Sequence, residues 1–355
     1  MYGKIFWRER RSVDPACRAG FMAEVRLSKA PEIPPGRRDL LTENRAAHLL
    51  GWQLYCHPLS VRLRIMVAST QYTQNIIAAL DQAAEANRQT PGRQGGLVAL
   101  TPELADELMV TGDLHGHRRN FNLIKRAANL DVHPRRHLLL QEVCHGGPSY
   151  PHNEGCMSHT VLEDVALLKV KYPERVHFIL GNHELAEMTD YPIQKNRQML
   201  NVQFRRGLQH MYGPAAVEVR AAYVRFLRSC PLAMRLPHGI FLSHSLPEGV
   251  DVQGFDPDIF AREIEPDDCA EGKDVFRLVW GRDYRRENAR AFAELVGARV
   301  LISGHEPCYE GFLAPSDLQI IIDCCGDNAA YVILPVGQEL SHDEIMGRMR
   351  KLEEG

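Results

Sequence analysis

Short apolar runs alternate with amphipathic stretches between residues 105 and 336, and most of the runs end at a glycine or a polar residue. Hydrophobic positions spaced three or four apart predict helices, and short apolar runs bounded by turn residues predict buried strands. Strands are expected at 107–111, 137–141, 175–180, 299–303, 318–323 and 330–336, with a hairpin formed by 233–236 and 239–243. Helices are expected at 118–129, 160–171 and 287–296, with helical structure over 190–230 and an acidic loop region over 248–274. This alternation of strands and helices predicts an α/β fold with partly parallel strands.

The first hundred residues follow a different pattern. Residues 1–45 contain proline and arginine without periodicity, and helices are expected only at 43–55 and 72–88. The Thr-Pro-Gly-Arg-Gln-Gly-Gly stretch at 90–96 is typical of a loop and is the best candidate boundary. We therefore expect a partly flexible N-terminal extension over 1–100, a main domain over 101–340 and a C-terminal helix or tail over 341–355. The basic first 21 residues are interpreted as a flexible tail, or as a reading frame that truly starts at Met22, in preference to a targeting arm.

Composition narrows the class of protein. The 355 residues are 45% hydrophobic and 25% charged, as is ordinary for a globular protein, and the net charge of −3 argues against binding nucleic acid by charge alone. Nine cysteines without a CxxC spacing favour a reduced, cytoplasmic protein. No apolar run approaches the ~20 residues of a membrane span.

Polar residues that can bind metals stand where the predicted strands end. Gly-Asp-Leu-His-Gly at 112–116 and Gly-Asn-His-Glu at 181–184 each follow an apolar run, and two further runs end at His244 and His305. Such motifs can be mere turn punctuation. In an open α/β sheet, however, residues beyond the carboxyl ends of strands converge. Asp, His and Asn side chains gathered in this way are what a two-metal phosphoester hydrolase needs.

Taken in order, these motifs resemble those of the calcineurin-like metallophosphoesterases, and within them the phosphoprotein phosphatase branch. The resemblance covers roughly residues 105–336 and also rests on the segments 172–176, 230–232, 241–244, 278–280, 304–305 and 325–329. It implies a β-sandwich of two mixed sheets flanked by helices, with two metal ions at the strand ends. It also implies roles: metal binding for Asp113, His115, Asn182, His244 and His305, and general acid for His183.

The residue types agree with that chemistry. Mixed His, Asn and carboxylate ligands suit Mn, Fe or Zn better than Ca. Two such cations ~3.5–4 Å apart would offset the charge of a phosphomonoester and activate a water molecule. An imidazole titrates near pH ~6.5, so His183 could donate a proton to the leaving oxygen. Asn182 is expected to contact the substrate as well.

One stretch departs from the family pattern. The family expects Gly-Asp-x-x-Asp-Arg-Gly after the second strand, whereas residues 141–147 read Gln-Glu-Val-Cys-His-Gly-Gly. Glu142 would then be the metal-bridging carboxylate, unless it faces solvent. His145 would replace the carboxylate that orients His183, as a catalytic hydrogen-bond partner, an extra metal ligand or a structural residue. Gly146 removes the phosphate-binding arginine, which Arg282 or Arg277 could replace; further candidates are Arg118 and Arg119.

Other polar residues near the motifs have plainer interpretations. His117 is expected to form hydrogen bonds rather than bind metal, and the insert at 148–158 is either a lid over the site or a surface loop. Cys144 and Cys156 match no familiar closed zinc spacing with the neighbouring histidines.

Three hypotheses follow for the function. The first is a metal-dependent phosphoesterase that hydrolyses phosphomonoesters, including phosphoserine or phosphothreonine in proteins, with water as nucleophile. The second is a hydrolase of nucleotides or other small phosphoesters, suggested by the missing arginine. The third is a catalytically weak pseudophosphatase that binds a partner, suggested by the altered 142–146 stretch.

Overall fold

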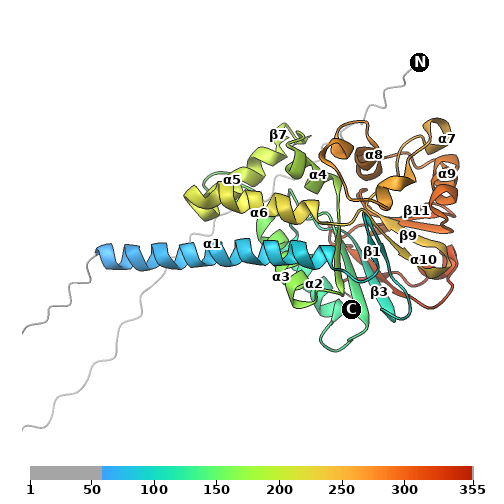
Figure 1. The fold of residues 1–355 in the computed structure, drawn as a ribbon, viewed down its shortest axis with the longest axis horizontal. Helices are drawn as coiled ribbons and strands as arrows, with labels where there is room; N and C mark the ends of the chain where they lie inside the picture. Colours follow the sequence, from blue (N-terminus) through green and yellow to red (C-terminus); the bar gives the residue numbers. More distant parts are fainter. Residues whose placement is uncertain (1–57, 354–355) are drawn as a thin grey trace, which may run out of the picture. The chain divides into compact units, whose positions relative to one another are not determined.

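The computed structural model describes residues 58–353, with side chains from residue 70 onward; the helix expected at 43–55 lies outside the described residues. Two β-sheets occupy the centre of this part of the chain, with helices on their outer faces (Figure 1). This is the α/β arrangement of two mixed sheets flanked by helices that the motifs predicted.

The first sheet has five strands in the order β14-β13-β3-β4-β5. The strands β3, β4 and β5 run parallel, and β13 lies antiparallel to β3. Its strands are β3 (Glu107–Asp113), β4 (Arg136–Gln141), β5 (Val176–Ile179), β13 (Ala330–Pro335) and β14 (Arg350–Lys351). The helices α2 (Arg118–Ala128) and α3 (His159–Lys171) make the crossovers between the parallel strands.

The second sheet has seven strands in the order β1-β2-β8-β9-β10-β12-β11. The β8–β9 hairpin is antiparallel as predicted, and β9, β10 and β12 are parallel to one another. The strands are β1 (Arg93–Gln94), β2 (Leu97–Ala99), β8 (Ala233–Leu236), β9 (Ile240–Ser243), β10 (Val300–Ser303), β11 (Phe312–Ser316) and β12 (Gln319–Ile322).

Alternation along the strands joins the two sheets into one core. Leu108 and Val110 of β3 point into the cluster between the sheets, whereas Met109 points to the cluster beneath the helices. On β4, Leu139 points into the cluster between the sheets, and Leu138 and Leu140 point to the cluster beneath the helices. Because successive side chains of a strand point to opposite faces, such strands need apolar residues at every position. That requirement explains why they read as continuous apolar runs.

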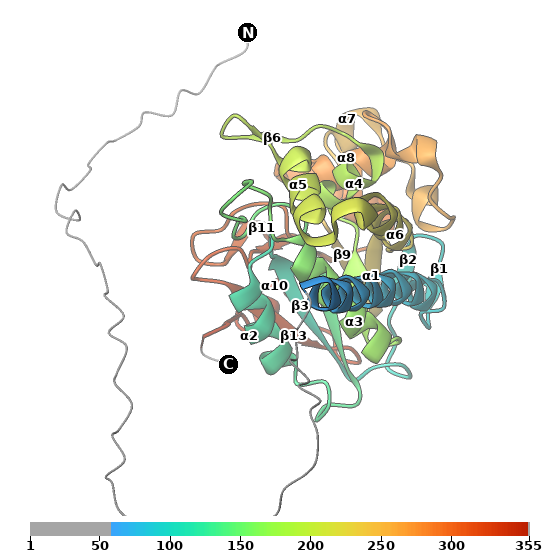
Figure 2. The same cartoon turned by 90° about the vertical axis from the view of Figure 1, so that its left-hand side faces the viewer.

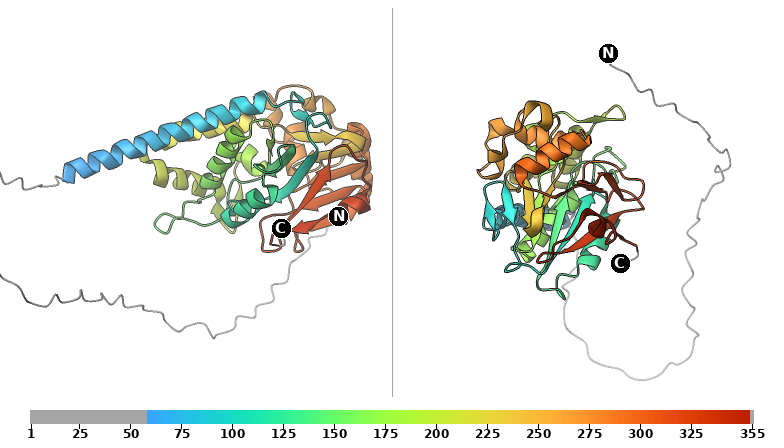
Figure 3. Two further views of the ribbon diagram at one scale, coloured as in Figure 1. Left: turned by 90° about the horizontal axis from the view of Figure 1, so that it is seen from below. Right: turned by 90° about the vertical axis from the view of Figure 1, so that its right-hand side faces the viewer.

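The helices α1, α3 and α6 pack together. The helix α1 (Pro58–Arg88) is longer than predicted and packs against α3 and α6. Figure 2 looks down the axis of α1, and the left panel of Figure 3 shows α1 lengthwise beside α6. Residues 58–100, expected in an N-terminal extension, thus contribute a helix and the β1–β2 hairpin to a unit that begins at Cys56. The remaining helices are α4 (Asn182–Thr189), α5 (Leu200–Tyr212), α6 (Ala216–Arg228), α7 (Val250–Gln253), α8 (Asp274–Trp280), α9 (Arg286–Val296) and α10 (His342–Met346).

The prediction of helix throughout 190–230 is wrong at its start. Residues 194–199 form a hairpin of β6 (Gln194–Lys195) and β7 (Gln198–Met199) before α5 begins. Its turn residues Asn196 and Arg197 both have positive φ, a conformation that usually requires glycine. Because the turn contains no glycine, its strongest signal is missing from the sequence. No helix among residues 58–353 is long and apolar enough to span a membrane.

Candidate active site

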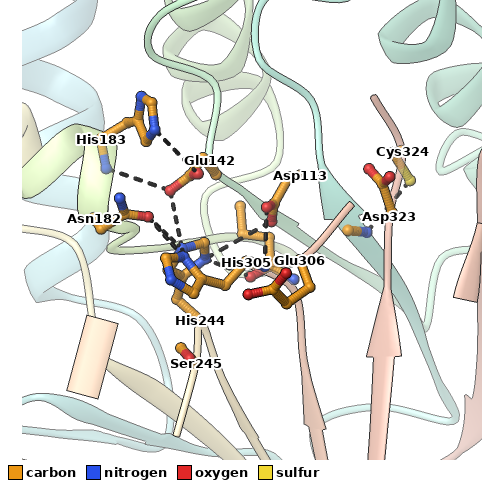
Figure 4. A network of polar contacts seen from close by, with 12 residues as sticks. Asp113, Glu142, Asn182, His183, His244, Ser245, His305, Glu306, Asp323 and Cys324 are labelled. Carbon is orange, nitrogen blue, oxygen red and sulfur yellow. Dashed lines mark hydrogen bonds and ion pairs between the residues drawn. The ribbon is translucent and has the colours of Figure 1, made fainter. Parts of the chain in front are cut away.

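Five strand ends from both sheets meet at one place. Asp113 is the last residue of β3, Glu142 follows β4, and Asn182 opens α4 directly after β5. His244 follows β9 and His305 lies two residues beyond β10. Figure 4 shows these side chains pointing toward one another. The predicted convergence of the motif residues is therefore observed in the structure.

His244 lies at the centre of this group, and its ring orientation is fixed. The Nε2 atom lies 2.9 Å from Glu142 Oε2 and 2.9 Å from Asn182 Oδ1. Its Nδ1 atom lies 3.0 Å from Gln141 Oε1, and the Gln141 amide nitrogen donates to the Thr111 carbonyl oxygen. Because Gln141 offers an oxygen, Nδ1 carries the donated proton and the Nε2 lone pair can face the oxygens.

His115 is held in the same manner by the backbone. Its Nδ1 lies 3.2 Å and 3.1 Å from the carbonyl oxygens of Cys144 and His145. Its Nε2 therefore points its lone pair toward Glu142 Oε1, 3.3 Å away. Glu142 thus stands between two histidine groups, and it is 1% exposed, so the alternative that it faces solvent is wrong.

Acceptors outnumber donors in this buried group. His305 Nδ1 lies 2.9 Å from Asn182 Oδ1 and 3.1 Å from His244 Nε2. Asp113 Oδ2 accepts from the His305 amide, but Asp113 Oδ1 and His305 Nε2 are buried without a partner. Buried polar atoms are nearly always paired. A buried group in which acceptors face one another and two atoms lack a partner therefore fits a cation. Within the part of the chain that the structure describes, two clusters could hold an ion: His115–Glu142–His183 and Glu142–His244–His305.

Electrostatics support the same interpretation. Burial and the charge of Glu142 raise the pKa of Asp113 to about 7. Burial lowers the pKa of His244, but the carboxylates of Glu142 and Asp113 outweigh it and raise that pKa to about 9. In the metal-free protein a proton on His244 therefore supplies part of the positive charge that the carboxylates need.

Backbone strain is concentrated at the site. His115, Glu142, His145 and His305 all have positive φ, between 40° and 72°. Non-glycine residues seldom adopt this conformation, and it persists where surrounding structure enforces it, often at functional sites. Gly181 is required by close packing, because a Cβ there would lie 2.5 Å from Glu142 Oε2.

Comparison with known proteins agrees with this geometry. The model of the calcineurin-like phosphoesterases matches residues 107–309, more than half of the chain. The chain belongs to this family. It is therefore a metallophosphoesterase, a hydrolase of a family that binds divalent metals, with a candidate His/Glu metal site.

Two solved structures share the fold at low identity. A protein serine/threonine phosphatase from Saccharomyces cerevisiae has a TM-score of 0.55 at 16% identity, over 74% of this chain and 82% of that one. A cold-active protein tyrosine phosphatase has a TM-score of 0.50 at 11% identity, over 70% and 77% of the two chains. No curated protein matches the chain by sequence.

The departure from the family pattern has a definite geometry. His145, in the position of the family's carboxylate, has its Nδ1 2.9 Å from His183 Nδ1. Its Nε2 lies 3.3 Å from Glu187 Oε1, a contact that the sequence analysis missed. The signal was present, because Glu187 follows His183 by four residues, the spacing of neighbours on a helix face. Neither metal-binding cluster of the described residues includes His145.

A cleft of about 540 Å³ opens over the cluster. Arg282 lines the cleft, where it forms an ion pair with Glu306, and Tyr284 also donates to Glu306. The β6–β7 hairpin adds Lys195 to the rim. The other arginine candidates do not line it: Arg277 pairs with Asp274, Arg118 with Asp164 and Arg119 with Glu353.

The remaining candidates are structural in this fold. The His117 ring accepts from the Asn120 amide and caps α2. Residues 148–158 do not line the cleft, so the lid interpretation is not supported. Cys156 contacts the Gly146 carbonyl and Ser158, and no metal-binding cluster of the described residues includes a cysteine.

Proposed function

We propose that this metallophosphoesterase hydrolyses phosphomonoesters, with phosphoserine and phosphothreonine in proteins as the substrate class. In this proposal Asp113, His115, Glu142, Asn182, His244 and His305 hold two divalent cations, Mn, Fe or Zn. When bound, these ions would offset the charge of the phosphate and activate a water molecule for attack. Glu142, with one oxygen toward His115 and the other toward His244, is the residue assigned to both ions.

The observation that carries the proposal is the set of fixed lone pairs around Glu142. Gln141 contacts Nδ1 of His244, and two backbone carbonyl oxygens contact Nδ1 of His115. The Nε2 atoms of both rings therefore face Glu142. Metal-binding histidines are typically held in this way. The open cleft supports a substrate displayed on a larger molecule, and the yeast structure is titled a protein serine/threonine phosphatase.

The chain's own residues would then act as follows. His183 Nε2 lies 3.9 Å from Glu142 Oε1 and lines the cleft, from where it would donate a proton to the leaving oxygen. Asn182 would contact the substrate beside its metal. Arg282 would bind the phosphate once it leaves Glu306.

A second candidate is a hydrolase of nucleotides or other small phosphoesters. It is favoured by Gly146, which stands where the family has an arginine, and by the ion pair that engages Arg282. A weaker grip on a doubly charged phosphate would reduce the preference for monoesters over diesters.

Hydrolysis of 4-nitrophenyl phosphate and of bis(4-nitrophenyl) phosphate, with and without added manganese, tests the proposal. We expect manganese-dependent turnover of the monoester that is lost in His183→Ala, followed by dephosphorylation of a phosphoserine peptide. Faster turnover of the diester would favour the second candidate. Turnover no higher than that of His183→Ala, in folded and metal-loaded protein, would contradict both and favour a binding protein.

A further inference from the structure

Three side chains, the partly exposed His183 and the buried His145 and Glu187, form a line that leads away from the cleft. The helix α4 carries His183 and Glu187 four residues apart on one face, and His145 lies between them. His145 and Glu187 are 1% and 2% exposed. His145 is fixed by its backbone amide, which donates to Ser158 Oγ, and by edge contact with the Phe204 ring. The side chains therefore have little freedom to choose other partners.

We propose that Glu187 is a positioning residue, which sets the ring orientation of His183 through His145. A carboxylate only accepts, so His145 Nε2 must donate to Glu187 and His145 Nδ1 is left as an acceptor. His183 Nδ1 then donates to His145, so that His183 Nε2 faces the cleft and is the nitrogen that exchanges a proton with the leaving oxygen. One buried carboxylate thus determines which nitrogen carries the proton in both rings.

The covalent geometry explains how a histidine replaces the carboxylate of the family pattern. The His145 atom that meets His183 is Nδ1, as many bonds from Cα as an aspartate Oδ. His145 therefore offers an acceptor at the same position, while its far nitrogen reaches a carboxylate on α4. The expected like-charge conflict between two imidazoles does not arise, because His145 accepts as a neutral ring.

Glu187 also has a structural contact that must be separated from this role. Arg220 Nε lies 3.4 Å from Glu187 Oε2, and Arg220 Nη2 donates to the Glu187 carbonyl oxygen. Arg220→Gln removes this ion pair and leaves the His145 contact intact. It is therefore the matched control for Glu187→Gln.

The first readout is nitrogen-15 NMR of the histidine rings in metal-free protein, with His183→Asn to assign the signals. The wild type and Arg220→Gln are expected to show His183 protonated at Nδ1. In Glu187→Gln the amide can donate to His145. The proton would then sit on the other nitrogen in both rings, so that His183 is protonated at Nε2. An unchanged His183 pattern in Glu187→Gln would overturn the inference.

The second readout is the rescue of turnover. We expect Glu187→Gln to lower kcat by roughly 10- to 100-fold, within the range of general-acid contributions, with KM changed less than about twofold. In a His145→Asp background, where a carboxylate meets His183 directly, Glu187→Gln should change kcat less than about twofold. An equal loss in both backgrounds, or the same loss in Arg220→Gln, would overturn the inference. His145→Asn serves as the background if His145→Asp does not fold.

The inference rests on the proposed role of His183, but the two can fail separately. If the wild type shows no turnover but Glu187→Gln changes which nitrogen of His183 carries the proton, the proposed function is contradicted and the positioning role of Glu187 is supported. Turnover with no change of the protonated nitrogen and no loss in Glu187→Gln would do the opposite.

Discussion

Among the described residues, the clusters of histidine around two buried glutamates, Glu163 and Glu142, are satisfied in different ways. Around Glu163, the carboxylate accepts from Tyr72, Tyr212 and Tyr223, and His159 Nδ1 lies 2.9 Å from it. Around Glu142, the neighbours are the Nε2 atoms of His115 and His244, Asn182 Oδ1 and the carboxylate of Asp113. Most of these atoms are hydrogen-bond acceptors. The first cluster supplies its own donors, whereas the second requires a cation.

The pKa values reflect this difference. Burial raises the pKa of Glu163, but hydrogen bonds from His159 and the tyrosines outweigh it, so that pKa lies below its usual value. Burial and the charge of Glu142 instead raise the pKa of Asp113 to about 7. The number of available donors, rather than burial or residue type, thus distinguishes a structural cluster from a metal site.

Neutralising Glu142 should have the largest effect on activity. Glu142→Gln is expected to lower phosphomonoester turnover by about 10³-fold or more, because it removes the shared carboxylate. Its stability in chelator should fall by less than that of Glu163→Gln, because the loss of the ion pair with His244 is partly offset by relief of the repulsion with Asp113. Steady-state kinetics and urea unfolding in EDTA check the two halves. A destabilised variant with normal turnover would reverse our assignment of this cluster.

The matched change in the other cluster should act on stability instead. Glu163→Gln places an amide nitrogen among hydroxyl and ring donors and is expected to lower the free energy of unfolding by about 2–4 kcal/mol. Turnover of the folded protein should stay within about twofold of the wild type. Urea unfolding measures the loss, with Tyr72→Phe as a milder control that removes one donor. An unchanged unfolding midpoint would show that the cluster is not structural.

Sequence alone could locate the second cluster's metal-binding candidates and not its supporting residues. Asp113, Asn182, His244 and His305 end apolar runs, and topology brings such ends together. The spacing of Glu187 four residues after His183 could have placed it on the same helix face, but its contact with His145 depends on the folded structure. The β6–β7 hairpin was missed because Asn196 and Arg197 take the positive φ that glycine normally signals. The edge strand β11 contains Pro315 and has a register shift, which obscured its pattern.

A buried cation without a carboxylate partner extends the comparison to pH. Lys169 Nζ donates to Thr90 Oγ1 and the Val176 carbonyl oxygen, and burial lowers its pKa to about 7. Between pH ~7 and ~10.4 the unfolded chain keeps this proton and the folded chain does not, so stability rises with pH. Over about pH 7 to 9.5 the rise should reach roughly 3 kcal/mol at most in the wild type.

Lys169→Met should lack this contribution, and urea unfolding of both proteins at several pH values measures the difference. Equal slopes for the two proteins would show that Lys169 stays protonated in the folded state.

The smallest expected effect concerns the rim of the metal cluster. Glu306→Gln should lower KM for an anionic phosphomonoester by about two- to fivefold, because an exposed ion pair on Arg282 is worth only ~0.2–1 kcal/mol. The control is Tyr284→Phe, which removes the other partner of Glu306 and keeps its charge. The opposite result, an unchanged or higher KM in Glu306→Gln, would exclude Arg282 from phosphate binding.

Counting bound manganese by equilibrium dialysis and elemental analysis tests the central claim most directly, because it needs no substrate. The account predicts two ions per chain in the wild type and in Glu163→Gln, and fewer than one in Glu142→Gln. No bound manganese in the wild type, or equal binding in all three proteins, would contradict the assignment of the Glu142 cluster as a two-metal site.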